Sequence, residues 1–267
     1  MLEHPEEPPL GETFLRAVWQ RQTEMYKMLF AHGVDTLLTP IFGPDLLERG
    51  EEYVKLVLPG LLWCAQNQDI LGFYEACDVR VRVYGDTRRY LNNTPYACVL
   101  EAYEELARRT AAHRSHRLFF GVCAHDAAET VAEIGARFYQ EHGRLPTRHE
   151  IVEAYYGEYV EPASFFIGFD RPVAFDFPLL DTGNVDLYFT VSPSPYLDER
   201  GLRTILYDHL YTRRVDESGY GELEPQDRAW MEAFYQVNLG RTIGIGMQRG
   251  GVWYPLPQVQ LPADSTE

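Results

Sequence analysis

The stretch Ser164–Val191, SFFIGFDRPVAFDFPLLDTGNVDLYFTV, decides the fold. Two apolar runs within it, Ser164–Ile167 and Val185–Val191, have the composition of buried strands and are bounded by turn-forming residues. Arg171 lies in the connector, and Asp186 lies inside the second run. Because an unpaired buried charge is costly, these groups must be paired or lie at the end of the sheet. Ligands bind at strand ends in open α/β sheets, so the stretch predicts a wall of an active site, with a charged loop between core strands as the alternative.

The rest of the chain alternates helical and strand-like segments. The expected helices are 11–32, 45–77 with an interruption at 59–60, 95–112, 124–142, 146–156 with Thr147 as its cap, 197–213 and 225–239. The other expected strands are 34–42, 78–84 and 116–123, and a glycine-rich hairpin is expected over 241–254. This alternation predicts an α/β fold with a mostly parallel central sheet and helices on both faces. We expect a disordered acidic lead-in over 1–10, one domain over 11–254 and a disordered tail over 255–267.

Composition and charge narrow the class of function. The chain has 267 residues, 45% of them hydrophobic, which is enough for a sizeable core. A formal net charge of −16 argues against nucleic acid and anionic membranes as partners, because both attract basic surfaces. An anionic substrate would need a local basic cluster or a bridging divalent cation.

The cysteines and the termini indicate a cytoplasmic protein. The four cysteines form no C-x-x-C pair, so reduced thiols are expected and a zinc site is not. The N-terminal segment MLEHPEEPPL has no signal-peptide pattern, and no apolar run reaches the length of a membrane span.

Two stretches place charged residues where a strand ends. In VYGDTRRYL (Val83–Leu91), Arg88 and Arg89 follow a glycine turn, and paired arginines can bind a diphosphate. The alternative is a solvated turn in which they pair with Asp86 or nearby glutamates. In FGVCAHDAAE (Phe120–Glu129), a helix N-terminus could attract an anion and His125 could act as acid or base, while Asp126 could simply cap the helix.

Asp186 is the third candidate, because a carboxylate among apolar neighbours must be paired or bind a metal. Magnesium favours a few carboxylates together with phosphate oxygens of a substrate. The alternative is a salt bridge from Asp186 to an arginine such as Arg171.

Longer runs resemble a known superfamily. AHGVDTLLTPIF (Ala31–Phe42), DVRVRVYGDTRRY (Asp78–Tyr90) and DLYFT (Asp186–Thr190) resemble the cis-prenyltransferases, which have the undecaprenyl diphosphate synthase fold. Within that superfamily the sequence is most similar to the tuberculosinol synthase and tuberculosinyl-adenosine transferase group. The matching runs are KMLFAHGVDTLLTPIFGPDLLERG (Lys27–Gly50), PTRHEIVEAYYGEYVEPASFFIGFDR (Pro146–Arg171), FDFPLL (Phe175–Leu180) and LRTILYDHLYTRR (Leu202–Arg214).

The resemblance implies an enzyme that ionises an allylic, diterpene-type diphosphate with the help of Mg²⁺. Water or a nucleoside such as adenosine then captures the cation, and the enzyme is expected to be a homodimer. The resemblance also implies roles for particular residues. Arg88, Arg89 and Arg171 would bind the diphosphate, and Asp186 would bind the metal, so that Asp186 and Arg171 are the expected catalytic residues. The apolar pocket would be lined by Tyr155, Tyr156 and Phe169.

Two departures from the superfamily pattern matter. The D-G-x-x-R motif of its first strand is not found, since only MLEHPEEPPL precedes the first expected helix. The fold as given therefore lacks that strand, and we expect the reading frame to continue upstream of Met1. GFDR (Gly168–Arg171) replaces the R-T-G-G-E stretch of the chain-elongating enzymes, which argues against chain elongation. A chain-elongating cis-prenyl diphosphate synthase and an inactive binding subunit stay open as alternatives.

Overall fold

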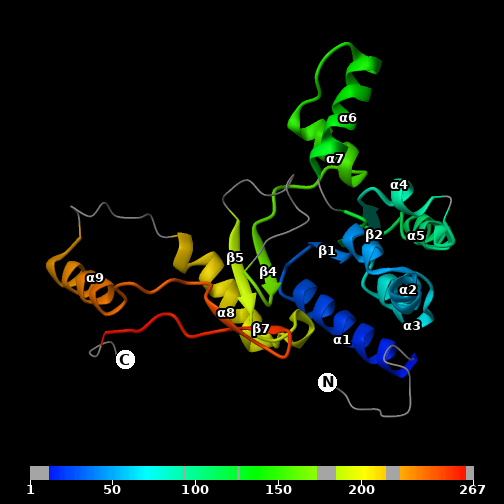
Figure 1. The fold of residues 1–267 in the computed structure, drawn as a ribbon. Coiled ribbons are helices and arrows are strands. Elements are labelled where there is room, and N and C mark those ends of the chain that lie inside the picture. Colours follow the sequence, from blue (N-terminus) through cyan, green and yellow to red (C-terminus); the bar gives the residue numbers. More distant parts are fainter. Residues whose placement is uncertain (1–11, 93, 125–126, 173–184, 215–222, 263–267) are drawn as a thin grey trace. The chain divides into compact units, whose positions relative to one another are not determined.

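The computed structural model describes residues 12–92, 94–124, 127–172, 185–214 and 223–262 (Figure 1). The chain forms two compact units, and each is described by itself. The first unit contains the described residues up to Ser164, together with Val185. The second contains 165–172 and the described residues from Asp186 onward. The division into units does not test the single domain expected over 11–254, which stays a prediction.

A three-stranded parallel sheet forms the centre of the first unit. Its strands are β1 (Thr36–Phe42), β2 (Val79–Tyr84) and β3 (His116–Val122), in the order β1-β3-β2. Pro40 lies in β1 opposite Gly121, and the register shifts just after it. The predicted parallel α/β arrangement is confirmed by these strands.

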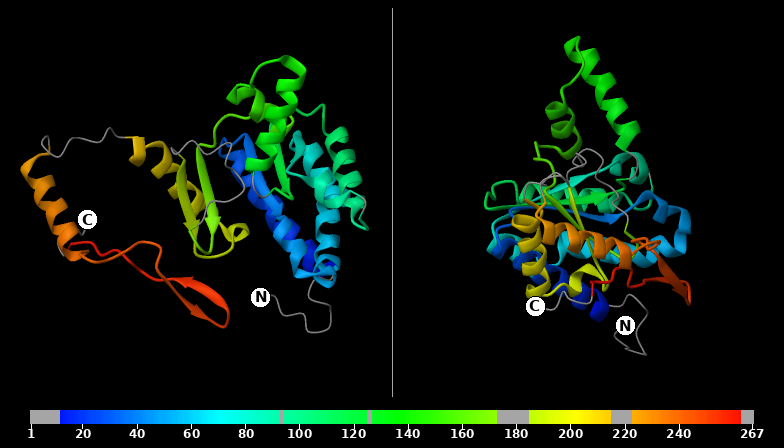
Figure 2. Two further views of the ribbon diagram at one scale, coloured as in Figure 1. Left: turned by 45° about the horizontal axis from the view of Figure 1, so that its top comes forward. Right: turned by 90° about the vertical axis from the view of Figure 1, so that its left-hand side faces the viewer.

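Helices cover both faces of this sheet, as the alternation predicted (Figure 2). They are α1 (Glu12–Ala31), the 3₁₀ helix η1 (Pro44–Arg49), α2 (Glu51–Gln66), α3 (Gln68–Ala76), α4 (Thr87–Leu91), α5 (Ala97–Arg109), α6 (Ala127–His142) and α7 (Arg148–Tyr156). Leu118 and Phe120 of β3 point into the core that α1, α2, α3 and α5 cover. Phe119, between them, points to the opposite face and packs with residues of α7. Successive strand residues point to opposite faces, so the two clusters lie on the two sides of one sheet.

Helix α2 contradicts one expectation, because it runs without a break through Pro59. A proline inside a helix removes one backbone hydrogen bond. Here Val54, Leu61 and Cys64 are buried on both sides of the proline. Trp19 of α1 also donates its indole N–H to the carbonyl of Gly60 at 3.2 Å. We attribute the continuous helix to this packing, which outweighs the local defect.

Helix α7 has defined ends. Thr147 and Glu150 form a capping box at its start, which confirms Thr147 as the cap. The Arg144 guanidinium is the main cause that lowers the pKa of Glu150 to about 2. The helix ends at Gly157, whose φ of 79° is readily available only to glycine.

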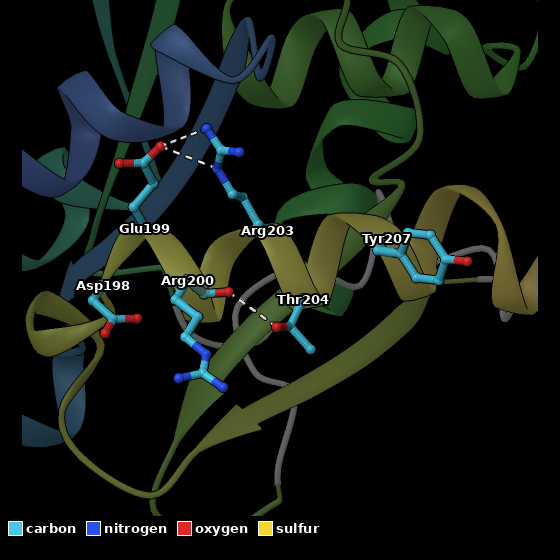
Figure 3. A pocket seen from close by; sticks show the side chains of 6 residues that line it. All are labelled: Asp198, Glu199, Arg200, Arg203, Thr204 and Tyr207. Carbon is cyan, nitrogen blue, oxygen red and sulfur yellow. Dashed lines mark hydrogen bonds and ion pairs between the residues drawn. The ribbon is translucent and has the colours of Figure 1, made fainter. Parts of the chain in front are cut away.

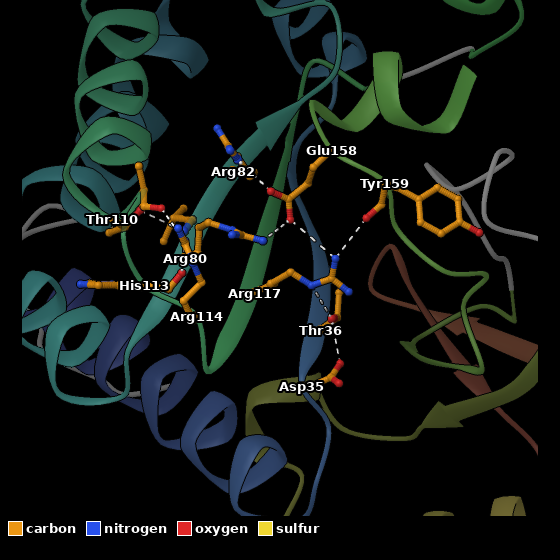
Figure 4. Close-up of polar contacts among 12 residues, drawn as sticks. Asp35, Thr36, Arg80, Arg82, Thr110, His113, Arg114, Arg117, Glu158 and Tyr159 are labelled. Carbon is orange, nitrogen blue, oxygen red and sulfur yellow. Dashed lines mark hydrogen bonds and ion pairs between the residues drawn. The ribbon is translucent and has the colours of Figure 1, made fainter. Parts of the chain in front are cut away.

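Directly after this end, Glu158 binds three arginines that project from the sheet (Figure 4). Its carboxylate is 2.7 Å from Arg80, 3.3 Å from Arg82 and 3.6 Å from Arg117. Arg117 also donates to the hydroxyl of Thr36 on β1 at 3.0 Å. One carboxylate thus connects the chain after α7 to the two neighbouring strands β2 and β3.

The second unit contains a two-stranded parallel sheet, further helices and a hairpin. Its elements are β4 (Phe165–Phe169), β5 (Asp186–Thr190), η2 (Ser194–Tyr196), α8 (Glu199–Leu210), η3 (Thr212–Arg214), α9 (Pro225–Val237), β6 (Gly246–Arg249) and β7 (Val252–Pro255). The predicted glycine-rich hairpin is confirmed as the antiparallel pair β6–β7. The predicted central sheet is thus found as two parallel sheets, one in each unit. In the part of the chain that the structure describes, no helix is both long and apolar enough to span a membrane.

We expect Glu158→Gln to lower the free energy of unfolding by about 2 kcal/mol, because three partly buried guanidinium groups lose their shared counter-charge. The Glu158 side chain is only 18% exposed, so solvent screens the loss poorly. Chemical denaturation measures the change. Glu153→Gln, on the exposed side of α7, is the matched control and should change stability little. Equal stabilities of the two variants would contradict the anchoring role of Glu158.

Candidate functional site

Arg88 and Arg89 lie in α4, directly beyond the carboxyl end of β2. Gly85 makes the turn between β2 and α4. Its φ is 106°, and a Cβ there would lie 2.4 Å from the Val122 carbonyl oxygen, so only glycine fits. The close approach of the turn to the end of β3 therefore sets where α4 begins.

Each of the two arginines is paired with a glutamate, as the alternative interpretation of this turn proposed. Arg88 donates to Glu104 at 3.0 Å, and Arg89 donates to Glu129 at 2.7 Å. Their side chains are 79% and 51% exposed. Exposed ion pairs contribute little free energy, so both arginines can exchange a carboxylate for a phosphate. Their role as diphosphate ligands stays a prediction.

Tyr155 and Tyr156 end α7 and are buried in the first unit. The ring of Tyr156 lies 5.0 Å from that of Tyr84 and 6.2 Å from that of Phe119, measured between centroids. Tyr155 packs against Tyr156 at 4.8 Å. The two tyrosines therefore belong to the core on the α7 face of the sheet.

A cavity of ≈ 240 Å³ opens between β2, α4, α5 and the end of α7. Its lining is mostly apolar, with charged side chains in addition: Arg82, Val83, Thr87, Arg88, Val99, Leu100, Tyr103, Glu104, Ala107, Tyr156 and Gly157. Two of the predicted site residues, Arg88 and Tyr156, thus line one cavity. Arg89 and Tyr155 are not among its lining residues.

In the second unit, Asp186 lies at the start of β5 with its side chain 14% exposed. His209 donates to its carboxylate at 2.6 Å, and Arg214 donates to the same oxygen at 3.2 Å. Arg213 lies 3.6 Å from the other oxygen. The alternative prediction was a salt bridge from Asp186 to an arginine such as Arg171. Asp186 does form salt bridges to arginines, but its described partners come from the end of α8 and from η3.

The same helix end holds a second carboxylate. The Tyr188 hydroxyl donates to Asp208 at 2.8 Å, and Arg213 donates to that carboxylate at 2.6 Å while its guanidinium lies 4.8 Å from the Tyr188 ring centroid. Burial and the hydrogen bond to Asp208 raise the pKa of Tyr188 to about 12. The hydrogen bond from Tyr188 and the one from Arg213 lower the pKa of Asp208. Tyr188 is therefore a neutral donor at physiological pH.

The register of β4 and β5 separates Asp186 from Arg171. Asp186 is paired with Phe165 at the start of both strands, whereas Phe169 is paired with Thr190 at their end. Arg171 follows Phe169 and is exposed, as is Phe169. At about 3.3 Å per residue, Asp186 and Phe169 lie ~13 Å apart along the strands, and Arg171 comes two residues after Phe169. Arg171 is not among the described ionic partners of Asp186, and the catalytic role of the two residues stays a prediction.

Two of the candidate residues lie outside the described part of the chain, namely His125 and Asp126. The lead-in expected over 1–10 likewise lies outside the described residues.

The surroundings of Asp186 bear on its predicted role as a metal ligand. No group of three or more His, Cys, Asp and Glu side chains in the described ranges is placed to hold a metal ion. Asp186 has two guanidinium groups and a histidine as its described partners. The Mg²⁺ requirement stays a prediction.

A wide hollow of ≈ 730 Å³ lies along α8 (Figure 3). Its lining comes from one short stretch, Asp198, Glu199, Arg200, Arg203, Thr204 and Tyr207. Arg203 donates to Glu199 one turn earlier, and Asp198 accepts from the Gly201 amide as the helix cap. These are local helix contacts, and the hollow supplies no convergent set of groups for catalysis.

The contacts of Glu158 with Arg117, and those of the residues that surround Asp186, were not predicted from the sequence. His209 and Arg213 are four positions apart, which puts them on one face of a continuing helix. That spacing could have marked them as a pair. Nothing local in the sequence indicates that Arg117, 41 positions earlier (158 − 117), meets Glu158.

The fold is that of the cis-prenyltransferases. A probable undecaprenyl diphosphate synthase from Campylobacter jejuni matches with a TM-score of 0.60 and 14% identity, over 79% of this chain and 94% of that one. Lavandulyl diphosphate synthase from Lavandula x intermedia, solved with dimethylallyl diphosphate, matches with a TM-score of 0.59 and 16% identity, over 76% and 86%. At these identities the likeness shows the fold alone.

Comparison of sequences narrows the class to a family. No family model matches the sequence. Tuberculosinyl adenosine transferase of Mycobacterium tuberculosis is 40% identical over 253 residues, which are 94% of this chain and 86% of the relative. The (+)-kolavelool synthase of Herpetosiphon aurantiacus is 26% identical over 92% and 81%. The chain belongs to the tuberculosinyl adenosine transferase family of enzymes, which confirms the family resemblance.

Proposed function

We propose that this protein is a cytoplasmic, Mg²⁺-dependent terpene synthase or prenyl transferase. It ionises an allylic diphosphate of the diterpene type, releases diphosphate, and lets water or a nucleoside capture the cation. The observation that carries the proposal is the 40% identity to tuberculosinyl adenosine transferase over 94% of the chain. The four cysteines are free, which supports a reducing compartment.

In the proposed reaction the allylic C–O bond breaks, and its electron pair leaves with the diphosphate. Cationic side chains stabilise the charge that develops on the leaving group. Arg88 and Arg89 suit this role because their present partners are exposed glutamates that a diphosphate can replace. A lone pair of water or of a nucleoside nitrogen then forms the new bond to carbon. Water loses a proton afterwards, whereas a nucleoside nitrogen takes over the positive charge.

Product analysis tests the proposal directly. Incubation with a C20 allylic diphosphate and Mg²⁺ should release diphosphate and give a prenyl alcohol, and added adenosine should give a prenylated nucleoside. Isopentenyl diphosphate should not be consumed. Its incorporation into longer chains would instead identify a chain-elongating synthase. A folded protein that turns over none of these mixtures would leave the binding-subunit alternative.

The metal role of Asp186 has its own test. Asp186→Asn keeps the shape but removes the charge, so turnover with Mg²⁺ should fall at least about tenfold. If Asp186 is a ligand, the Mg²⁺ concentration needed for half-maximal turnover rises. If it only anchors His209, Arg213 and Arg214, the melting temperature falls and the Mg²⁺ dependence does not change. Equal turnover of the wild type in excess EDTA would show that no metal is needed.

Arg171 is proposed as a diphosphate ligand from the second unit. Arg171→Ala should weaken binding of inorganic pyrophosphate about tenfold, because one charge-assisted contact is lost. Arg203→Ala is a suitable control, since it removes another exposed arginine of that unit that is paired with Glu199. Titration calorimetry measures both, and the same affinity in the two variants would remove Arg171 from the site.

We further propose that the protein is a homodimer and that residues 223–262 contribute to the interface. None of these residues is buried. Large apolar side chains are exposed along the segment, at Trp230, Tyr235, Val237, Leu239, Ile243, Ile245, Met247, Val252, Tyr254, Leu256, Val259 and Leu261. Exposed apolar surface of this extent marks an interaction site. Light scattering should give twice the chain mass of 30.8 kDa, and Ile243→Asp with Tyr254→Asp should shift it toward one chain. A wild-type mass of one chain at micromolar concentration would contradict the dimer.

A further inference from the structure

The carboxyl ends of the three strands in the first unit are joined in series by backbone hydrogen bonds. Cys123, directly after β3, donates its N–H to the carbonyl of Phe42, the last residue of β1, at 2.6 Å. The carbonyl of Cys123 accepts the N–H of Asp86, which follows the turn after β2, at 3.3 Å. Cys123 therefore connects the ends of β1 and β2 at the edge of the sheet where α4 begins.

Cys123 has an uncommon backbone conformation at this junction. Its φ is 54°, in the left-handed region that residues with a side chain rarely adopt. Burial, and after it the Asp86 carboxylate, raise the pKa of the Cys123 thiol to about 12, so the thiol is neutral at physiological pH and a poor nucleophile. Strained residues cluster at functional sites, and this one lies at the carboxyl end of a strand, where open α/β sheets bind their ligands.

Asp86 extends this series of hydrogen bonds to two helices. Its carbonyl accepts the N–H of Tyr90 at 3.2 Å, which closes the first turn of α4. Its carboxylate accepts a hydrogen bond from the Thr130 hydroxyl, in the first turn of α6, at 2.9 Å. Asp86 itself is half-buried. One residue thus connects the end of β3, the start of α4 and the start of α6.

Helix α4 needs such an anchor because it has only five residues. Isolated helices of this length are unstable in water, so contacts with neighbouring elements must fix its direction. The ion pairs of Arg88 and Arg89 are too exposed to do this, since exposed pairs contribute little free energy. Leu91 is buried in the core and fixes the end of α4. Asp86 fixes its start, and the two arginines lie between these anchors.

The partner of Arg89 lies next to the partner of Asp86. Glu129, which accepts a hydrogen bond from Arg89 at 2.7 Å, directly precedes Thr130 in α6. The bond between Asp86 and Thr130 therefore holds α4 at the separation from α6 at which Glu129 reaches Arg89. An anion that displaces Glu129 leaves this bond intact, so α4 keeps its place while Arg89 changes its partner.

We propose that Asp86 is a positioning residue, which holds α4 so that Arg88 and Arg89 present their guanidinium groups to a diphosphate. It acts through its hydrogen bonds with Thr130 and the backbone of Cys123, and it does not touch the anion. The proposal rests on the proposed function, because that function makes the two arginines diphosphate ligands.

Titration calorimetry with inorganic pyrophosphate tests the proposal. Asp86→Ala and Thr130→Val each remove the hydrogen bond between the start of α4 and α6, and each should weaken pyrophosphate binding at least about fivefold. Asp86→Asn keeps an oxygen that accepts from Thr130 and should stay within about twofold of the wild type. Thr130→Val keeps the shape of the side chain, so it tests the contact even if Asp86→Ala fails to fold.

Thr110→Val is the control for a purely structural loss. It removes a hydroxyl that accepts from the Val81 amide at 3.0 Å, nearer the amino end of the same sheet. The melting temperature should fall because a buried amide loses its acceptor, while pyrophosphate affinity should stay within about twofold of the wild type.

A double-mutant cycle separates positioning from direct contact. In protein that carries Arg88→Gln and Arg89→Gln, Asp86→Ala should weaken pyrophosphate binding by less than about twofold further. The reason is that a positioning residue has no effect once the groups that it positions are gone.

Three results would overturn the proposal, and they differ in what else they remove. If Arg88→Gln with Arg89→Gln leaves pyrophosphate affinity unchanged, the arginines are not diphosphate ligands, and that part of the proposed function fails as well. If this double variant weakens binding but Asp86→Ala and Thr130→Val do not, only the positioning role fails. If Asp86→Ala has its full effect without the two arginines, Asp86 does not act through them.

Discussion

The first unit depends on the ion pairs of Glu158. Three guanidinium groups on one face of a sheet repel one another, and one carboxylate at 2.7–3.6 Å from each compensates this repulsion. Because Glu158 follows α7 directly, the same contacts determine where α7 lies on the sheet. Tyr156 and the floor of the cavity take their positions from that helix. The electrostatics of the sheet face therefore help to determine the shape of the cavity between β2, α4, α5 and the end of α7.

Exposure separates two uses of arginine in this acidic chain. Arg80 has a side chain only 19% exposed, and its contact with Glu158 is shielded from solvent. Such a pair is costly to break, because the partner would be left as a buried charge. Arg88 is 79% exposed, and its pairing with Glu104 can be exchanged at little cost. Arginines of the first kind determine structure, and those of the second kind can bind the phosphate groups of a ligand. Asp186, which is mostly buried and has three partners, has the contacts expected of the first class.

Much of the fold could be predicted from local patterns. Alternating helices and strands predicted the parallel sheets, and Thr147 predicted a helix cap. The surroundings of the candidate site were harder to predict, because contacts such as that of Arg117 with Glu158 leave no periodic signal in the sequence. The distance between Asp186 and Arg171 has a topological cause. In parallel strands the chain must cross back, so residues that flank the connector lie at opposite ends of the pair. Pro59 is the opposite case. It is a strong local signal for a break in the helix, yet α2 continues through it, because residues on both sides of the proline are buried.

Pro40 of β1 has a consequence for how the protein behaves in concentrated solution. The Arg117 amide donates to Asp35, so the alternation along β1 directs position 40 away from β3. A proline there presents no N–H at the outer edge of the strand. Any strand that approaches this edge, whether from the same chain or another, loses one ladder hydrogen bond and meets a bulky ring. The edge is thereby a poor template for the strand-to-strand growth that leads to aggregates.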